Sequence, residues 1–474
     1  MRRWLAALVV AAGPWLAPAV PAGAQAVAPA AAPAAAAPAP ATVQNALRAV
    51  ESELNLLLGR YATPLDVAAL LDAGWRGVVE AAPGAPAGAA APFAPDREAA
   101  WADFGARFRA AAGTPGADPG ALARAANRAM ARSVGDCHTA FAPSHERELL
   151  SFDGSGRYGG VGASVADPGT FEPRPPGPLV VQVTEDGPAQ RAGVRAGDAV
   201  LEVDGADAVG LTPSRLVELV RGEPGTAVRL RLDRPGEAEP VEVTVERALL
   251  DVRPVEGRLL SVPAPAGDRV TSTLTAAPGP ARYQVGYVSL REFSRAAEAA
   301  LPAKLEELRA AGATHWVLDL RGNRGGNLNT FTRLASLFIS EGTLAVTIDR
   351  DGAEAAIRAE GASFRPYTRP LAVLVDRQSA SAAELLAADL QEYGAARLFG
   401  ATTAGCFGTS RLFRLPDGSA LWLTVSALQS GLERRDVHRV GLEPDEAVSR
   451  SRGELAEGVD GPLARALAWV VERG

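Results

Sequence analysis

Strand-like and helix-like segments alternate between residues 283 and 474, and this alternation constrains the fold more than any other feature of the chain. Short apolar runs predict buried strands, and the amphipathic segments between them, including 302–311, predict helices. The runs cover residues 283–290, 316–320 and 371–375, with further strands around Leu398 and at 421–425. We therefore expect a largely parallel sheet with helices on its faces.

Ser381 follows the apolar run 371–375 and opens the next predicted helix. Together with Glu384 it fits a capping box, in which serine and glutamate satisfy free N–H groups of the first helical turn. The same position suits a nucleophile, because the N–H groups and the dipole at a helix start can stabilise an oxyanion. The pattern by itself leaves capping and catalysis open.

The segment 376–384 resembles the nucleophile segment of the carboxyl-terminal processing (tail-specific) serine proteases. The resemblance implies that residues 283–474 form an α/β catalytic domain of the ClpP/crotonase-like kind, with Ser381 as the nucleophile. In that family a lysine base follows the serine by 25 residues, and here position 406 is a cysteine. Cys406 thus stands in place of the expected base.

A glycine-rich loop at residues 321–327 follows the strand 316–320. Glycine is needed in a tight strand-to-helix turn, and no Lys-Ser/Thr pair follows that would indicate a phosphate loop. The loop resembles the family's Asp-Leu-Arg-x-Asn-x-Gly-Gly segment. That resemblance implies an oxyanion hole made of the Ala382 N–H and the N–H of Gly325 or Gly326.

His138 is the candidate for the missing base. A lone histidine is more often structural, but the tricorn-type relatives place a general-base histidine in an equivalent segment before the PDZ domain. The resemblance to this branch implies a Ser381–His138 pair, and imidazole suits a base near neutral pH. The group that orients His138 stays open between Asp136 and a later set consisting of Glu433, Asp436 and His438.

The chain has two cysteines, Cys137 and Cys406, and each stands beside a candidate catalytic position. In an exported protein they could form a disulfide that holds His138 near Ser381. One alternative is that Cys406 acts as a thiol nucleophile activated by His138. The other is that both are small, inert core residues.

Residues 158–247 resemble a PDZ domain of the protease-associated kind. The features are glycine-rich turns and strands beginning at Tyr158, at 179–183, 228–232 and 241–245, with a helix from Thr212-Pro213. The resemblance implies that the strand 160–165 docks an extended peptide and that nearby backbone N–H groups bind its terminal carboxylate. The residues concerned are Tyr158, Gly159, Gly160, Val161 and Gly162. An internal packing role for this domain is the alternative.

The amino-terminal part divides into three expected segments. Residues 1–24 have the charge, apolar core and small-residue end of a secretory signal peptide. Residues 25–41 are almost entirely Ala and Pro and predict an extended linker. Residues 42–150 predict a helical domain, with apolar residues at helical spacing from Val43 to Leu57.

Net charge and hydropathy argue against a nucleic-acid-binding or membrane-spanning protein. The net charge of −7 gives no electrostatic case for nucleic acid, and no later stretch is long and apolar enough to cross a membrane. No metal-spaced cluster is visible along the chain, and no cofactor is implied. The fold class expected is multidomain α+β. The function expected is an exported, periplasmic or extracellular serine endopeptidase that cleaves unfolded or C-terminal peptide segments, and the alternative is an inactive relative that only binds peptides.

Overall fold

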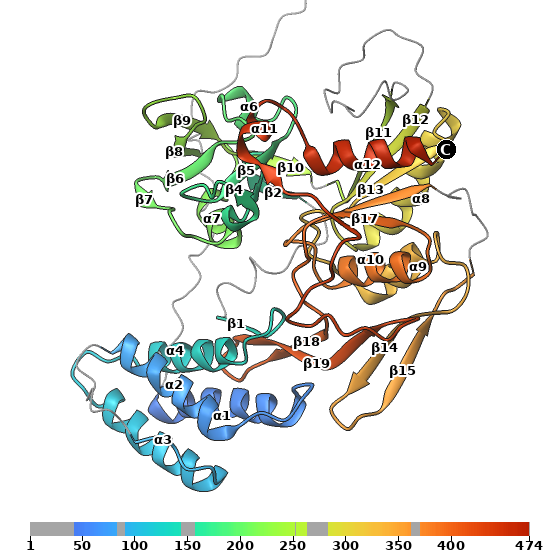
Figure 1. Ribbon diagram of the computed structural model, residues 1–474. Coiled ribbons are helices and arrows are strands. Elements are labelled where there is room, and N and C mark those ends of the chain that lie inside the picture. The colour runs from blue at the N-terminus through green and yellow to red at the C-terminus, as the bar shows by residue number, and fades with distance from the viewer. Residues whose placement is uncertain are drawn as a thin grey trace, which may run out of the picture.

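The computed structural model describes residues 42–82, 91–143, 157–251, 253–262, 283–361 and 370–473. The expected signal peptide and the Ala/Pro linker lie outside the described residues. Figure 1 shows a helical lobe at the bottom, a small strand-rich lobe at the upper left and a larger α/β lobe on the right. The mixed helix and sheet class expected from the sequence is confirmed.

Four helices form the amino-terminal lobe, and polar side chains mark where they begin. Thr42, Asp66, Asp96 and Asp118 each accept a backbone N–H from the first turn of the helix that follows. The apolar faces of the helices share one core, which also contains residues of two distant strands. The helices are α1 (Val43–Arg60), α2 (Val67–Ala81), α3 (Arg97–Ala112) and α4 (Pro119–Ser133).

The helical lobe ends in a short strand that the sequence analysis did not predict. Strand β1 (Ala140–Ala142) pairs antiparallel with β19 (Ala420–Ser430), so that Phe141 lies opposite Leu421. Phe141, Leu421 and Leu423 are buried in the core of the helical lobe. A three-residue strand whose partner lies far along the chain has no local signal, so the prediction of a purely helical segment was incomplete.

The strand-rich lobe has an antiparallel sheet in the order β3-β5-β6-β8-β9, with β7 paired to β6. The single strand expected from Tyr158 is instead two strands, because Gly162 takes a positive φ of 76° between β2 and β3. Strand β2 pairs with β10 outside this sheet. The elements are β2 (Arg157–Gly160), β3 (Ala163–Ala166), β4 (Phe171–Glu172), β5 (Leu179–Val183), α6 (Pro188–Arg191), β6 (Ala199–Val203), β7 (Ala206–Asp207), α7 (Pro213–Val220), β8 (Ala227–Asp233), β9 (Val241–Glu246) and β10 (Ala248–Asp251).

The α/β lobe is built on a sheet in the order β11-β12-β13-β16-β17-β20, parallel from β12 to β20 as expected. Helices α8, α9 and α10 pack on one face and α12 on the other (Figure 1). The bounds are β11 (Val255–Val262), β12 (Tyr283–Leu290), α8 (Arg295–Ala310), β13 (His315–Asp319), α9 (Leu328–Ala335), β16 (Leu371–Val375), α10 (Ala382–Glu392), β17 (Arg397–Gly400), β20 (Glu446–Ala447) and α12 (Gly461–Glu472).

Two features of this lobe differ from expectation. Helix α8 begins at Arg295 and contains Pro302, where the sequence analysis had started the helix. A second, antiparallel sheet was not expected beyond its longest strand, β19, although two of its pairings are hairpins between strands that follow each other along the chain. It joins β19 to β14 (Thr343–Asp349), β15 (Glu354–Arg358) and β18 (Thr409–Arg414).

The carboxyl-terminal segment fastens the strand-rich lobe to the α/β lobe. Strand β21 (Arg450–Ser451) pairs with β4, and α11 (Arg452–Ala456) follows it. Arg452 donates to the Asp233 carboxylate at 2.7 Å and to the Gly197 carbonyl at 2.9 Å. The two lobes are therefore joined by backbone pairing and by partly buried charged hydrogen bonds.

Candidate active site

Ser381 lies at the turn between the buried strand β16 and helix α10. It is the N-terminal cap of α10, and its φ of 57° with ψ of −122° is a backbone conformation that side-chain-bearing residues rarely adopt. Its N–H donates to Glu384 Oε2 at 2.9 Å. The neighbouring Ala380 N–H donates to the Asn323 carbonyl at 2.9 Å. A strained backbone held by hydrogen bonds from neighbouring residues is typical of functional positions, and the strain at Ser381 was not expected from the sequence.

The glycine loop lies directly against this serine. Gly325 has a φ of 90°, and a Cβ atom on it would lie 2.7 Å from Ser381 Cβ. The Gly325 N–H donates to Asn323 Oδ1 at 2.8 Å, so this donor is engaged within the loop. Gly326 follows with a φ of 145° beside the Phe293 carbonyl. Only glycine fits these two positions, because a Cβ would overlap Ser381 or Phe293.

A buried charged network holds the base of the glycine loop. The Arg321 guanidinium donates to both carboxylate oxygens of Asp319 and both of Asp460, at 2.7 to 3.0 Å. Gly322 N–H donates to Asp376 Oδ1 at 3.0 Å, which ties the loop to the turn before Ser381. These contacts fix the start of the loop at Arg321 and Gly322.

Glu384 connects the serine to the position where the family's lysine is expected. Its Oε2 atom accepts the Ser381 N–H at 2.9 Å and the Cys406 N–H at 2.8 Å. Its Oε1 atom accepts the Gly405 N–H at 2.7 Å and the Thr403 hydroxyl. Because one fully buried carboxylate binds both segments, Cys406 lies beside Ser381. The sequence predicted the capping contact of Glu384, but not this second set of partners.

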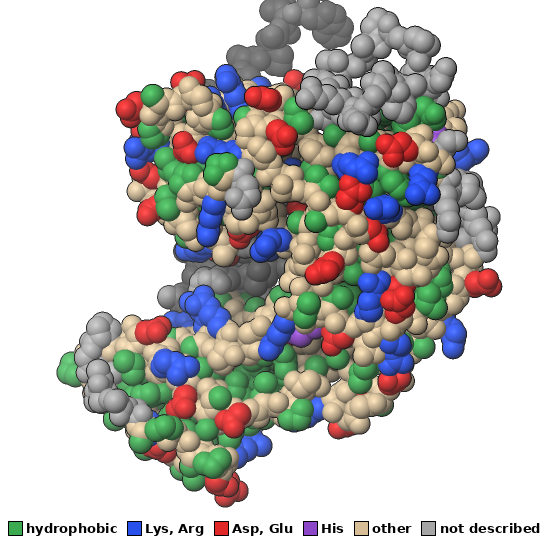
Figure 2. All heavy atoms as spheres, in the orientation of Figure 1, with side chains coloured by type: hydrophobic (Ala, Val, Ile, Leu, Met, Phe, Trp, Pro, Cys, Tyr) green, Lys and Arg blue, Asp and Glu red, His purple; other side chains and the backbone are tan. Residues whose placement is uncertain are grey.

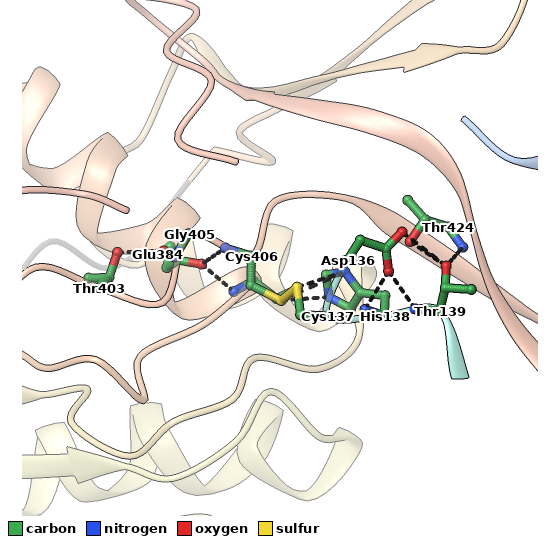
Figure 3. Close-up of a disulfide and its surroundings, with 10 residues drawn as sticks. Asp136, Cys137, His138, Thr139, Glu384, Thr403, Gly405, Cys406 and Thr424 are labelled. Atoms are coloured by element: carbon green, nitrogen blue, oxygen red, sulfur yellow. Dashed lines mark hydrogen bonds between the residues drawn. A yellow bond between two sulfur atoms is a disulfide. The ribbon is translucent and has the colours of Figure 1, made fainter. Parts of the chain in front are cut away.

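Cys406 and Cys137 form a disulfide, with their Cα atoms 5.9 Å apart and 269 residues between them along the chain. Figure 3 shows the bridge between the Glu384 network on one side and the segment 136–139 on the other. The His138 ring lies against it, with Nε2 3.6 Å and Nδ1 3.8 Å from Cys406 Sγ. The pairing that the sequence analysis raised as one of three alternatives is present in this structure.

His138 is largely buried, and it makes no hydrogen bond with Ser381 among the residues that the structure describes. Burial lowers the pKa of His138 below its usual 6.5; the Asp136 carboxylate opposes this shift, and repulsion from His438 adds to it. The ring is therefore neutral near pH 7, which is the state that a general base requires.

Asp136 does not bind the His138 ring. Its Oδ1 accepts the backbone N–H groups of His138 and Thr139, at 2.9 and 2.6 Å, and its Oδ2 accepts the Thr139 hydroxyl at 2.9 Å. Burial alone would raise the pKa of the Asp136 carboxyl, but hydrogen bonds from Tyr61, Thr139 and Thr424 hold it below its usual value. Asp136 thus stabilises the turn that carries His138.

The other candidates for orienting His138 have different partners. Glu433 lies 3.4 Å from Arg435 in an ion pair, and Asp436 accepts the N–H of His438 at 2.9 Å. Within the described ranges, none of Glu433, Asp436 and His438 makes a hydrogen bond with the His138 ring. His438 acts on His138 only through charge.

An exposed apolar row next to the site was missed by the sequence analysis. Trp422 in β19 lies opposite both Ala140 in β1 and Leu412 in β18, so the three side chains share one face of the sheet. Trp422 and Leu412 are 37% and 42% exposed. Thr424, on the same face, contacts Thr139 next to His138. The available signal was the position of Trp422 between Leu421 and Leu423 in a predicted strand, which places its side chain on the face opposite to theirs.

The expected peptide-binding segment lies in the strand-rich lobe. Tyr158, Gly159 and Gly160 pair with β10, and Val161 is buried, with its carbonyl accepting the Ala189 N–H. Strand β3, which follows Gly162, is at the edge of its sheet. The face of the molecule in Figure 2 is hollowed between this lobe and the helical lobe.

Comparison with known proteins identifies two regions. Residues 284–448 match the model of peptidase family S41, and residues 179–234 match a PDZ domain model. A carboxyl-terminal-processing protease of Picosynechococcus is 31% identical over 67% of this chain and 71% of its own length. The chloroplastic carboxyl-terminal-processing peptidase 2 of Arabidopsis thaliana is 29% identical over 68% of this chain.

Solved structures confirm the fold. The photosystem II D1 C-terminal processing protease superimposes with a TM-score of 0.55 at 24% identity, covering 85% of this chain and 92% of that chain. Mature CPAF gives a TM-score of 0.56 at 12% identity, covering 91% and 98%. The chain spans 59% and 58% of the length of two curated relatives. No helix among the described residues has the length and apolarity to span a membrane.

Proposed function

Because the chain belongs to the carboxyl-terminal processing proteases of peptidase family S41, we propose that it is a serine endopeptidase with Ser381 as its nucleophile. The observation that carries this proposal is the single Glu384 oxygen that accepts both the Ser381 N–H and the Cys406 N–H. This oxygen joins Ser381, at the start of α10, to Cys406. The disulfide sulfur of Cys406 lies 3.6 Å from His138 Nε2. A chain of contacts through Glu384 and Cys406 therefore links Ser381 to His138, which supports assigning them as nucleophile and base.

In the proposed mechanism the Ser381 hydroxyl attacks the peptide carbonyl and His138 takes its proton. His138 then gives the proton to the leaving amine, and water hydrolyses the acyl-enzyme by the same route. The ring approaches the serine when substrate binds, since catalytic hydrogen bonds are often long before that. Cys406 cannot replace the lysine as a base, because a disulfide sulfur carries no titratable proton.

The oxyanion formed in this attack needs donors near Ser381. We assign the Ala382 N–H, at the start of α10, and an N–H of the glycine loop to this role. The Gly325 N–H donates to Asn323 Oδ1, so we assign the second donor to Gly326. A helix start also favours the negative charge that develops on the carbonyl oxygen.

The substrate proposed is an unfolded or C-terminal polypeptide segment. Strand β3 is at the edge of its sheet, so an extended peptide could add to it by backbone pairing. The exposed row Ala140, Trp422 and Leu412 would then accept apolar side chains of the segment entering the site. We further propose that residues 1–24 direct export to the periplasm or medium, where a disulfide is stable.

Purified protein and a chemically unfolded polypeptide test this function. We expect cleavage by the wild type and a loss of roughly 10³-fold or more for Ser381→Ala. A fluorophosphonate probe should label Ser381 and no residue of the Ser381→Ala variant. Equal inactivity of wild type and variant, with peptide binding retained, would instead establish the inactive peptide binder.

A further inference from the structure

We propose that reduction of the Cys137–Cys406 disulfide creates a binding site for a thiophilic divalent cation of the Zn²⁺ class, with Cys137, Cys406 and His138 as ligands. The ligand atoms of these three residues lie within 4.8 Å of one another. Two thiolates and one imidazole form a donor set typical of zinc. The spacing along the chain gave no sign of it, since 269 residues separate the cysteines.

The distances suit such an ion once the bridge is open. Zinc binds sulfur at about 2.3 Å, so two thiolates on a tetrahedral ion lie about 3.8 Å apart. The Cα atoms of Cys137 and Cys406 are 5.9 Å apart, which lets side-chain rotation alone reach that separation. His138 Nδ1 is 3.7 Å from Cys137 Sγ, and Nε2 is 3.6 Å from Cys406 Sγ. The imidazole therefore already faces both sulfurs.

The surroundings hold the ligands in place without competing for the ion. The Glu384 carboxylate binds the Cys406 N–H, and the Asp136 carboxylate binds the turn that carries His138, so both segments stay fixed after reduction. A water molecule can complete the fourth position, because Cys137 is exposed.

Opening the bridge needs a dithiol reductant that can reach a sulfur. Cys137 is exposed and Cys406 is 5% exposed, so a reductant thiolate attacks Cys137 Sγ. The S–S bond breaks, and Cys406 leaves as a thiolate that takes a proton. The second thiol of the reductant then displaces Cys137 as a thiol, and the reductant becomes a disulfide. The cation binds both sulfurs and releases two protons.

The consequence for activity rests on the proposed function. An ion on His138 would occupy the proposed general base, so a reduced, metal-loaded protein would be inactive while the oxidised protein is active. The cation would be an inhibitor that acts only under reducing conditions. Metal binding itself is independent of whether Ser381 cleaves peptides, and it can be tested separately.

The test is a Co²⁺ titration of the full chain, oxidised and after anaerobic reduction with a phosphine. We expect the reduced wild type to bind one Co²⁺, with thiolate charge-transfer absorption in the near ultraviolet and the visible bands of tetrahedral Co²⁺. Zn²⁺ should displace Co²⁺ and remove these bands. The oxidised protein should show neither the charge-transfer absorption nor the visible bands. His138→Ala should weaken binding at least about tenfold, and a Cys137→Ser/Cys406→Ser protein should show no thiolate band.

Three results would overturn the proposal. The first is a reduced wild type without a thiolate band, and the second is equal Co²⁺ affinity before and after reduction. The third is loss of the native circular dichroism spectrum on reduction, since an unfolded chain has no preformed site. The comparison of oxidised with reduced protein uses only the wild type, so it remains valid even if the cysteine variants fold poorly. If the oxidised protein is inactive while the reduced protein gives the expected spectra, the proposed function is refuted and the metal site still stands.

Discussion

The serine side and the histidine side of the candidate site are held in different ways. Ser381 is fixed by its own neighbourhood, because strand β16, helix α10 and the loop around Gly325 all belong to the α/β lobe. His138 comes from the end of the helical lobe and is fixed by β1–β19 pairing and by a disulfide that spans 269 residues. The position of Ser381 therefore depends on the α/β lobe alone, whereas the position of His138 depends on how the helical lobe packs against the α/β lobe.

Because of this difference, substitutions near Ser381 and substitutions near His138 should have different effects on the protein. Damage to the serine side should alter chemistry while the lobes stay together, since Ser381 needs only its own sheet. Damage to the histidine side should alter the position of the base together with the contact between lobes. The predictions below test this distinction, starting with the largest expected effect.

Replacing the base gives the largest change. His138→Ala should lower kcat/KM by roughly 10³-fold or more, because it removes the proton acceptor and leaves the oxyanion hole. Its melting temperature should stay near that of the wild type. His438→Ala is the matched control and should keep kcat/KM within a few-fold. Steady-state kinetics with an internally quenched fluorescent peptide would measure kcat/KM of both variants. Full activity of His138→Ala would show that another group is the base.

Removing the bridge tests the dependence on lobe assembly. Cys137→Ser/Cys406→Ser should lose about 2–5 kcal/mol of unfolding free energy, since a long closed loop constrains the unfolded chain. The kcat/KM of this variant should fall as well, because His138 loses its contact with the disulfide sulfur of Cys406. Urea unfolding followed by tryptophan fluorescence measures the first effect. Unchanged stability together with unchanged activity would show that the lobes hold His138 without the bridge.

Gly325→Ala tests the local half. A Cβ would lie 2.7 Å from Ser381 Cβ at a φ of 90°, so we expect a cost of about 1–3 kcal/mol and a matching loss of kcat. Gly352→Ala is the control, because Gly352 has a φ of 82° and open space around it. It carries the backbone strain without the contact. If both variants have the same kcat, the contact with Ser381 has no catalytic importance.

Trp422→Ala should have a smaller effect on substrate binding. Losing the large apolar side chain should raise KM several-fold for substrates with apolar residues and leave kcat nearly unchanged, a change of about 1 kcal/mol. Val209→Ala serves as the control, since Val209 is 50% exposed in the strand-rich lobe. A substrate series that varies one apolar position would measure it. Identical KM values across the series would remove the row from the substrate path.

The pH profile gives the smallest shift. Activity requires neutral His138, whose pKa burial holds below 6.5, so kcat/KM should rise with pH through a midpoint below that value and stay high above it. In His438→Ala this midpoint should move upward, because repulsion from His438 is gone. A midpoint above 6.5 in the wild type would contradict the buried position of His138.

Residues with local signals were predicted well. The apolar run 371–375, the capping pair of Ser381 and Glu384, and the glycine loop each carry their signal within a few positions, and the structure brings them together. Prediction from sequence failed where the partner strand is remote, as at β1, and at the start of α8, where the N-cap Ser294 makes no side-chain capping hydrogen bond. Trp422 was missed because exposure depends on what packs over a strand.

The sequence by itself determined the parallel sheet and the capping pair of Ser381 and Glu384 at a helix start, because periodicity and turn chemistry act over short distances. Only the tertiary structure decided which alternative applies to Cys137 and Cys406, where Asp136 directs its carboxylate, and that one Glu384 oxygen joins Ser381 to Cys406. These contacts join residues hundreds of positions apart, and their geometry exists only after the lobes have packed.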